Sequence, residues 1–343
     1  MDLAERQLIR PPERQTAASW RPIILTGFAL VVAGLLLHAT NPERVAWIQN
    51  FVLVLSALLI EAVPFVLLGA LVSAAIEVFV PPRAIEKLVR MPGPLQIPAA
   101  ALAGVAFPVC ECGSVPVARR LAMKGLSSGA VVTFMLAAPV ANPVVIASTF
   151  VAYRGRPVLW TMVLGRVILG LIVAMAVGWV MARQSKEQLI RPRPEDTPSP
   201  AAEAAHEHSG SKWRDYWGHV GGDFLFMGRF LMIGAAVAAG VQTFVPQSII
   251  GGVANTPVVS LLAMMALAWL LSLCSESDAF VAASFVQFGA ASQLAFLVFG
   301  PMIDMKLSAL YLGTYNRGFF RTVVIAVTAV TLVGTLWIQV LFG

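Results

Sequence analysis

Long runs of apolar residues, separated by short polar stretches, recur along almost the whole chain. Most runs approach the roughly 20 residues that an α-helix needs to cross a bilayer. They lack the short alternating strands of a membrane barrel, so helices are the expected spanning element. The pattern therefore predicts an all-α polytopic membrane protein. The expected apolar segments are residues 22–40, 48–80, 95–109, 127–150, 157–182, 222–245, 258–274, 279–290, 292–314 and 321–342.

Two polar stretches divide this pattern into parts. Residues 1–21 are predicted to be a cytoplasmic N-terminal segment, followed by an extra transmembrane helix at 22–40. Residues 183–221 are charged and rich in proline, a composition typical of a flexible linker. His206 and His208 within that linker leave a metal-binding tract open as an alternative. The membrane part then falls into two portions, 48–182 and 222–343.

These two portions resemble each other, which indicates an internal duplication. Several short matches occur at a nearly constant offset, more than chance similarity of apolar sequence explains. The matched pairs are LLGALVSAAIEVFVPPRAI (67–85) with MIGAAVAAGVQTFVPQSII (232–250), VCECGSVPVA (109–118) with LCSESDAFVA (273–282), Gly125 with Gly289, and AAPVAN (137–142) with FGPMID (299–304).

The distribution of lysine and arginine predicts how the repeats are oriented. If residues 95–122 and 258–290 each enter the membrane and return to the same side, almost all basic residues fall inside. Each half then has three transmembrane helices plus a re-entrant helical hairpin, and the odd number of crossings inverts the second half. We therefore predict two inverted repeats with one extra N-terminal helix, as in secondary transporters. The N-terminus and the central linker are expected on the cytoplasmic side of the inner membrane.

Composition supports a membrane location and excludes several other classes. The chain is 58% hydrophobic and 12% charged, with mean hydropathy +0.79, whereas a soluble domain has about 25% charged residues. The net charge of +6 comes from loops and does not indicate nucleic-acid binding. Motifs for nucleotide phosphates, serine hydrolysis or zinc proteolysis do not occur in the sequence, so we expect neither an enzyme nor a cofactor.

All three cysteines lie at the two expected breaks. Cys110 and Cys112 flank Glu111 in FPVCECGSVPVARR, where Gly113, Ser114 and Pro116 are expected to interrupt the helix. Cys274 opens the matching CSESD stretch. Irregular backbone at membrane depth must face protein or a water-filled cavity, so we expect the two breaks to meet mid-membrane around a substrate. Sulfur suits soft ligands, although a purely structural role for buried cysteines stays open.

Acidic residues at the same breaks suggest a proton pathway. Ionisable groups inside a membrane are costly and usually mark a relay or a substrate path. A capping role for Ser275, Ser277 and Asp278 is the alternative. The predicted proton relay consists of Glu111, Glu276, Asp278, Asp304 and Lys306. The predicted substrate-binding residues are Cys110, Glu111, Cys112, Gly113, Asn142, Cys274, Ser275, Glu276, Ser277, Asp278 and Asp304.

Further positions carry charges or breaks within apolar segments. Asn142 precedes Pro143, and Asp304 follows Pro301, so broken helices are expected at corresponding positions of both halves. Asp304 and Lys306 can alternatively form a simple ion pair. Glu61, Arg166 and Arg229 each lie within an apolar segment, and a structural ion pair among them is the mild interpretation.

The motifs FPVCECGSVPVARRLAMKG, LAAPVANPVVIAS and SLCSESDAFVAASF resemble those of the predicted permease family that includes the methylarsenite efflux permease ArsP. The resemblance covers about residues 50–182 and 222–342. It implies a permease, and trivalent methylarsenic is a thiophilic species that suits paired thiols. Glu111 between the cysteines departs from other members and favours a cationic or proton-linked substrate. The matching positions are Cys110, Cys112, Gly113, Pro116, Cys274, Ser275, Ser277 and Asp278.

The combined prediction is a secondary, proton-coupled permease of the inner membrane, exporting trivalent organoarsenicals or another small thiophilic or cationic solute. Its expected partners are that solute and the lipid bilayer, with homo-oligomerisation left open and no nucleic acid. One alternative is a membrane thiol–disulfide redox protein using Cys110 and Cys112, although Cys-x-x-Cys is the commoner redox spacing. Another is a structural scaffold in which the duplicated hairpins only pack.

Overall fold

The computed structural model describes residues 46–81, 90–107, 109–184, 189–191, 212–244 and 257–342. The predicted N-terminal segment, the extra helix at 22–40, and His206 and His208 of the linker lie outside the described residues. The chain divides into two compact units, residues 1–50 and 51–343. The described part of the first unit is only the start of one long helix, and everything below concerns the second unit.

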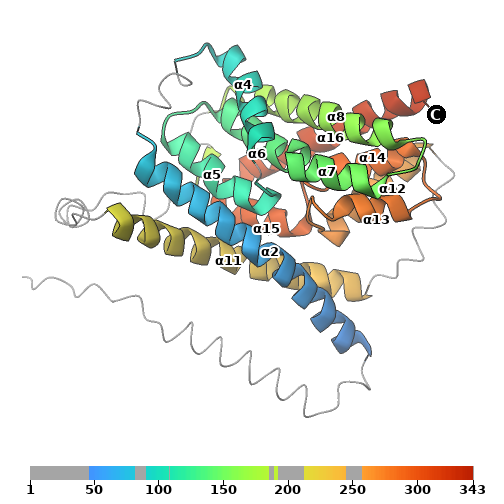
Figure 1. The fold of residues 1–343 in the computed structure, drawn as a ribbon, viewed down its shortest axis with the longest axis horizontal. Helices are drawn as coiled ribbons and strands as arrows, with labels where there is room; N and C mark the ends of the chain where they lie inside the picture. The colour runs from blue at the N-terminus through green and yellow to red at the C-terminus, as the bar shows by residue number, and fades with distance from the viewer. Residues whose placement is uncertain are drawn as a thin grey trace, which may run out of the picture. The chain divides into compact units, whose positions relative to one another are not determined.

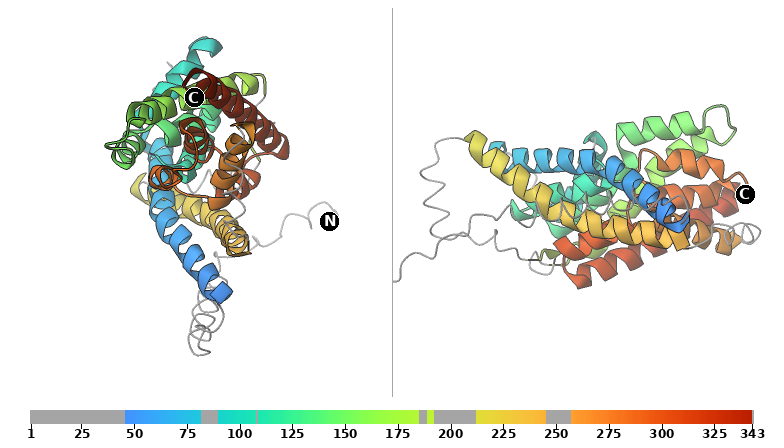
Figure 2. Two further views of the ribbon diagram at one scale, coloured as in Figure 1. Left: turned by 90° about the vertical axis from the view of Figure 1, so that its right-hand side faces the viewer. Right: turned by 90° about the horizontal axis from the view of Figure 1, so that it is seen from below.

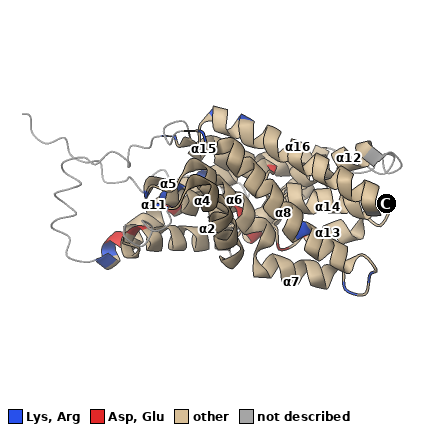
Figure 3. Ribbon diagram, turned by 90° about the horizontal axis from the view of Figure 1, so that it is seen from above, with Lys and Arg blue, Asp and Glu red and all other residues tan. Residues whose placement is uncertain are grey.

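The described chain is helical, with a single isolated β-bridge between Ile190 and Tyr315 (Figure 1). Five of its helical spans are long and apolar enough to cross a membrane, which confirms a polytopic membrane protein. Charged residues are sparse along them (Figure 3). The spans are α2 (Ala46–Phe79), α8 (Leu159–Met181), α11 (Lys212–Phe244), α16 (Arg317–Phe342), and the nearly continuous pair α6 (Ser128–Ala141) and α7 (Pro143–Ala152).

The two halves follow the same order of elements. Each begins with a long helix, continues with two short helices and a broken pair, and ends with a long helix. The first half adds α4 (Gly93–Ala106) and α5 (Glu111–Met123) to the helices named above. The second half adds α12 (Pro257–Leu271), α13 (Asp278–Ser284), α14 (Ala290–Phe299) and α15 (Met305–Thr314).

The broken helices occur where the sequence predicts them. Asn142 has extended backbone and its Oδ1 accepts from the Val145 N–H at 2.9 Å, which caps α7. Asp304 does the same for α15, with Oδ1 accepting from the Leu307 N–H at 2.6 Å. Pro143 fits the first position of α7, where its missing N–H leaves no bond unmade. The matching pattern AAPVAN and FGPMID therefore corresponds to two capped helix breaks.

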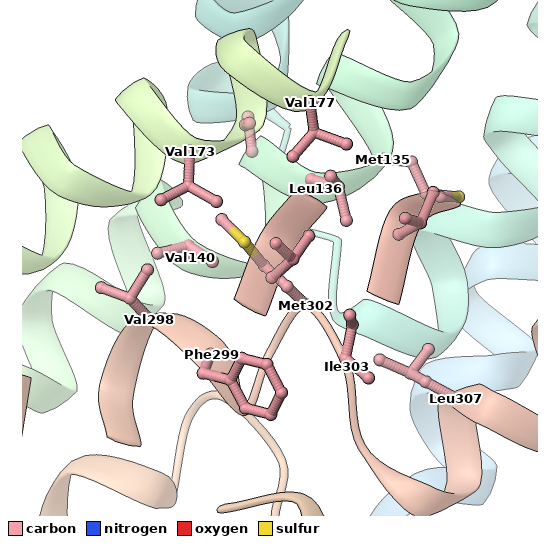
Figure 4. Close-up of a cluster of buried hydrophobic side chains, with 14 of the residues drawn as sticks. Met135, Leu136, Val140, Val173, Val177, Val298, Phe299, Met302, Ile303 and Leu307 are labelled. Atoms are coloured by element: carbon pink, nitrogen blue, oxygen red, sulfur yellow. The ribbon is translucent and has the colours of Figure 1, made fainter. Parts of the chain in front are cut away.

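The halves share one apolar core. In the first half α6 packs against both α4 and α8, and in the second half α14 packs against both α12 and α16. Val140 of α6, Val173 of α8, Val298 of α14 and Met302 of the break between α14 and α15 meet in this core (Figure 4). The short helix α5 contacts α15, and α13 contacts α7, so each half places a short helix against the broken pair of the other.

The two long helices α2 and α11 lie next to each other (Figure 2). Ser73 of α2 donates a hydrogen bond to Asp223 of α11 at 2.8 Å, and both side chains are buried. Arg120 of α5 reaches the same carboxylate at 3.4 Å. This polar contact ties three helices together near the start of α11.

Two helix boundaries differ from those expected from the sequence. The first break lies before Cys110, and Gly113, Ser114 and Pro116 lie inside α5, so their predicted role as helix breakers is wrong. Burial of almost the whole of α5 compensates for the backbone bond that Pro116 cannot make. Helix α11 begins at Lys212, within the expected linker.

The early start of α11 has a local cause. Trp213, Tyr216 and Trp217 contact one another through their rings, which holds the first turns together. His219 lies 3.5 Å from Arg120, so this part of α11 is also attached to α5. The polar composition of the first turns of α11 therefore did not indicate the helix that the structure shows there.

Helices α2 and α5 pack closely at two glycines. A methyl group at Gly69 would overlap the backbone of Gly113. Gly69→Ala is therefore expected to destabilise the fold by about 1–3 kcal/mol, measured as a lower Tm in detergent. Gly228→Ala is the control, because nothing lies within 4 Å of that added carbon and alanine favours a helix. Equal losses in both variants would contradict close packing at Gly69.

Candidate functional site

The two chain breaks predicted to meet are in contact. The Ser275 hydroxyl, in the loop between α12 and α13, donates to Glu111 Oε2 at 3.0 Å. Glu111 is the first residue of α5, and both side chains are buried. The Ser275 backbone N–H reaches the same oxygen at 3.5 Å. The break of one half therefore touches the break of the other.

Local hydrogen bonds shape each break. Cys110 has extended backbone, and its Sγ accepts from the Gly113 N–H at 3.4 Å, so the thiol caps α5. In the second half Ser272 adopts a positive φ of 48° and its hydroxyl accepts from the Met305 N–H at 3.0 Å. The Ser277 and Asp278 N–H groups both donate to the Cys274 carbonyl at 3.0 Å. These bonds hold the loop that carries Cys274.

A buried lysine lies between carboxylates of both halves. The Lys306 Nζ lies 3.7 Å from Glu111 Oε1 and 3.6 Å from Asp304 Oδ2. It also lies 3.8 Å from Cys274 Sγ. All four side chains are buried, and the two carboxylate oxygens have no hydrogen-bond donor. Two acids therefore share one loosely held ammonium group.

A second buried ion pair joins the halves. Arg166 of α8 contacts both oxygens of Asp278, at 2.8 and 2.7 Å. It also donates to Thr149 Oγ1 at 3.0 Å and to the Ser275 carbonyl at 3.1 Å. Such two-point arginine–carboxylate pairing is strong and fixes orientation. The arginine thus holds the first turn of α13 against the first half.

Each half supplies the cation that pairs with an acidic residue of the other half. Arg166 of the first half binds the acidic residue at the second break, and Lys306 of the second half faces the acidic residue at the first break. Ser277 adds another link, donating to Glu61 of α2 at 2.7 Å. Removing charges from water is costly unless they are paired, so these contacts depend on the two halves remaining together.

The predicted site residues differ in how they join this cluster. Hydrogen bonds or ion pairs link Glu111, Cys274, Ser275, Glu276, Asp304 and Lys306. Asp278 joins through Arg166. The contacts of Asn142 and Cys110 are local caps. Cys112 and Gly113 lie buried in the first turn of α5. All three cysteines are free thiols.

Three contributors were not assigned to the site from sequence: Arg166, Thr149 and Glu61. The suggested ion pair among Glu61, Arg166 and Arg229 is wrong, because Arg166 pairs with Asp278 and Glu61 accepts from Ser277. The guanidinium of Arg229 lies over the rings of Phe226 and Phe230. A buried arginine is costly unless a carboxylate neutralises it. The position of Arg166 within an apolar segment was therefore the signal that a carboxylate lies next to it.

Two tyrosines occupy equivalent positions and cross between the halves. Tyr153 follows α7 and donates to Gln293 Oε1 of α14 at 2.8 Å. Tyr315 follows α15 and donates to the Val115 carbonyl of α5 at 3.3 Å. Both side chains are buried. Within the described residues, no group of three histidine, cysteine or acidic side chains is arranged to hold a metal ion.

Comparisons with known proteins agree with the resemblance noted in the sequence. A family model described as "Predicted permease" matches residues 47–340. The UPF0718 protein YcgR of Bacillus subtilis is 38% identical over 285 residues, which cover 82% of this chain and 95% of that protein. A Streptococcus mutans protein named "Putative two-component membrane permease complex subunit" is 35% identical over 257 residues, 73% of this chain and 82% of that protein.

No solved structure matches the chain significantly. The family model covers nearly all of the described membrane part, including both chain breaks and both cross-half ion pairs. Both relatives are matched over more than four fifths of their own length. The chain therefore belongs to the predicted permease family.

Proposed function

We propose that this permease is a secondary transporter of the inner membrane whose substrate binds where the two chain breaks meet. The observation that carries the proposal is the buried cluster of Glu111, Asp304, Lys306 and Cys274, which draws on both halves. A transporter must change the contacts between its halves while it moves a solute. A site built across those halves couples binding to that change.

Proton coupling is supported by the charges at the cluster. Glu111 and Asp304 share the single ammonium group of Lys306, and one oxygen of each lacks a hydrogen-bond donor. A proton that binds to either carboxylate would neutralise it and remove the surplus negative charge of the cluster. Glu276, which accepts from Ser275 at 3.4 Å, and Asp278 extend the relay. The relay thus consists of the five residues predicted from sequence.

The two halves are proposed to be inverted repeats. The support is the common order of elements, the capped breaks at Asn142 and Asp304, and the equivalent tyrosines. In transporters built this way, discontinuous helices meet at the substrate and one repeat rocks against the other. Residues 48–182 and 222–343 would form these repeats, with residues 1–21 and the linker on the cytoplasmic side.

The class of substrate is inferred from the sulfur and carboxylate oxygen atoms that the site offers as ligands. Cys274 faces the ammonium group of Lys306, and Cys110 and Cys112 flank Glu111 at the other break. This combination of sulfur and carboxylate suits a small thiophilic or cationic solute, and trivalent organoarsenicals are the first to test. The redox alternative gains no support, because all three thiols are free and buried. Following the name of the streptococcal relative, we also propose that the chain works with a second membrane component.

The role of Glu111 in transport can be tested in inside-out vesicles. Wild-type vesicles with an acidic interior are expected to accumulate methylarsenite or another thiophilic or cationic solute, and dissipating the pH gradient should stop this. Glu111→Gln should lower the initial rate at least tenfold, because the site loses a charged group shared by both halves. Glu77→Gln is the control, since Glu77 lies outside the cluster, 3.7 Å from Arg120. Accumulation that ignores both the gradient and Glu111→Gln would reject the proposal.

A further inference from the structure

Arg229 is an exposed charge within a membrane-spanning helix. It is the eighteenth of the 33 residues of α11, and its side chain is exposed. Its guanidinium lies 4.3 Å from the ring centre of Phe226 and 4.9 Å from that of Phe230, both on the same helix. No carboxylate of the described chain lies within ion-pair distance of it. An arginine facing lipid costs about 2.5–3.5 kcal/mol by insertion scales, and stacking on aromatic rings offsets part of this.

The surface around Arg229 is apolar and open. Leu225, Ile233 and Val237 are about half exposed on the same side of α11. The same face presents Gly222 about one turn before Leu225 and Gly218 about two turns before it, spaced four residues apart, and nothing lies within 4 Å of where their side chains would begin. Small residues at this spacing let a neighbouring helix approach closely. The face around Arg229 thus has room for one more helix.

The described bundle of this chain leaves no carboxylate unengaged for that helix. Each of its carboxylates has a partner: Glu61 has Ser277, Glu111 and Asp304 have Lys306, Asp278 has Arg166, Glu77 and Asp223 have Arg120, and Glu276 has Ser275. The predicted extra helix, residues 22–40, contains no aspartate or glutamate. A second copy using the same face would bring two Arg229 side chains together, because a two-fold interface repeats each contact.

We infer that the outward face of α11 around Arg229 binds a transmembrane helix of a different membrane protein, and that this helix presents a carboxylate to Arg229. This inference depends on the proposed function in one respect, the expectation that the chain works with a second membrane component. Charge complementarity selects the partner: a buried arginine–carboxylate pair inside the membrane replaces a charge exposed to lipid. The glycines determine how closely that helix can lie.

The test measures binding alone, so it is independent of transport. The full chain, carrying a donor fluorophore, is reconstituted in phosphatidylcholine vesicles with an acceptor-labelled polyleucine helix of about 20 residues that carries one central glutamate. Energy transfer is expected with the glutamate helix and not with a glutamine helix. Arg229→Gln should weaken binding at least tenfold and Arg229→Lys less. Arg214→Gln, an exposed arginine near the start of the same helix, is the control and should not change it.

A second variant separates shape from charge. Gly222→Leu keeps Arg229, and nothing lies within 4 Å of the carbon that leucine adds to the backbone. This variant should also weaken binding. Equal transfer with both helices, or no effect of Arg229→Gln, would overturn the inference. Two other results would also overturn it. One is energy transfer between donor- and acceptor-labelled copies of this chain that Arg229→Gln abolishes. The other is immobilisation of spin-labelled phosphatidylglycerol that requires Arg229. The first would assign the face to self-association and the second to lipid.

Discussion

Replacing Arg166 with methionine is expected to abolish transport and to destabilise the fold. The change leaves Asp278 buried without the cation that contacts both of its oxygens. Breaking a buried pair by removing one partner costs about 3–5 kcal/mol. Thermal unfolding in detergent and transport in vesicles measure the two effects. Arg154→Met is the control, because Arg154 is exposed and surface substitutions usually change stability by less than about 0.5 kcal/mol.

The double variant Arg166→Met, Asp278→Asn distinguishes stability from function. Removing both charges should recover most of the lost stability, because no uncompensated charge stays buried. Transport should not recover, since the proposed relay lacks Asp278. Asp278→Asn alone should abolish gradient-driven flux while the protein still inserts in the membrane. Normal gradient-driven flux in either Asp278→Asn variant would remove Asp278 from the relay and leave the ion pair with a structural role only.

Replacing Lys306 with methionine should reduce stability and transport to a similar degree, because it disturbs the break that carries Glu111. Glu111 and Asp304 would lose the ammonium group that lies between them, so two buried carboxylates would face each other without a cation. We expect a stability loss of about 3–5 kcal/mol and flux that no longer responds to a pH gradient. Lys212→Met is the control, at the exposed start of α11. The measurements are again thermal unfolding and vesicle transport.

Adding Glu111→Gln to Lys306→Met tests whether the lysine acts through Glu111. The double variant keeps only Asp304 of the two carboxylates that face Lys306, so it should be more stable than Lys306→Met alone. A double-mutant cycle gives the coupling between the two residues, and contacting charges usually couple by about 0.5–3 kcal/mol. Additive effects would show that the 3.7 Å contact contributes nothing, and would contradict the shared-cation arrangement.

The features that followed from sequence are those with a local cause. The breaks at Asn142 and Asp304 depend on a capping side chain and a nearby proline, both visible within a few residues. The contact between the breaks at Glu111 and Ser275 followed from the rule that irregular backbone inside a membrane must be covered by protein. Five apolar spans and the family also agree with the sequence pattern.

The features that did not follow from sequence depend on distant partners. Arg166 and Asp278 are 112 positions apart, and no local signal indicates that they pair. Glycine, serine and proline at 113, 114 and 116 normally break a helix, but the burial of most of α5 overrode that preference. The start of α11 was hidden because polar residues there are held by Arg120 of another helix.

The tyrosines that follow α7 and α15 suggest where movement begins. Each donates a hydrogen bond to the opposite half, and such an uncharged bond is worth about 0.5–1.5 kcal/mol. Next to the tyrosines, Arg156 donates to the Ala283 carbonyl at 2.7 Å and Arg119 to the Thr314 carbonyl at 3.5 Å, so an arginine reinforces each of these contacts between the halves. If the repeats are inverted, these two sets of contacts face opposite compartments, and opening to one side requires that one set releases while the other holds.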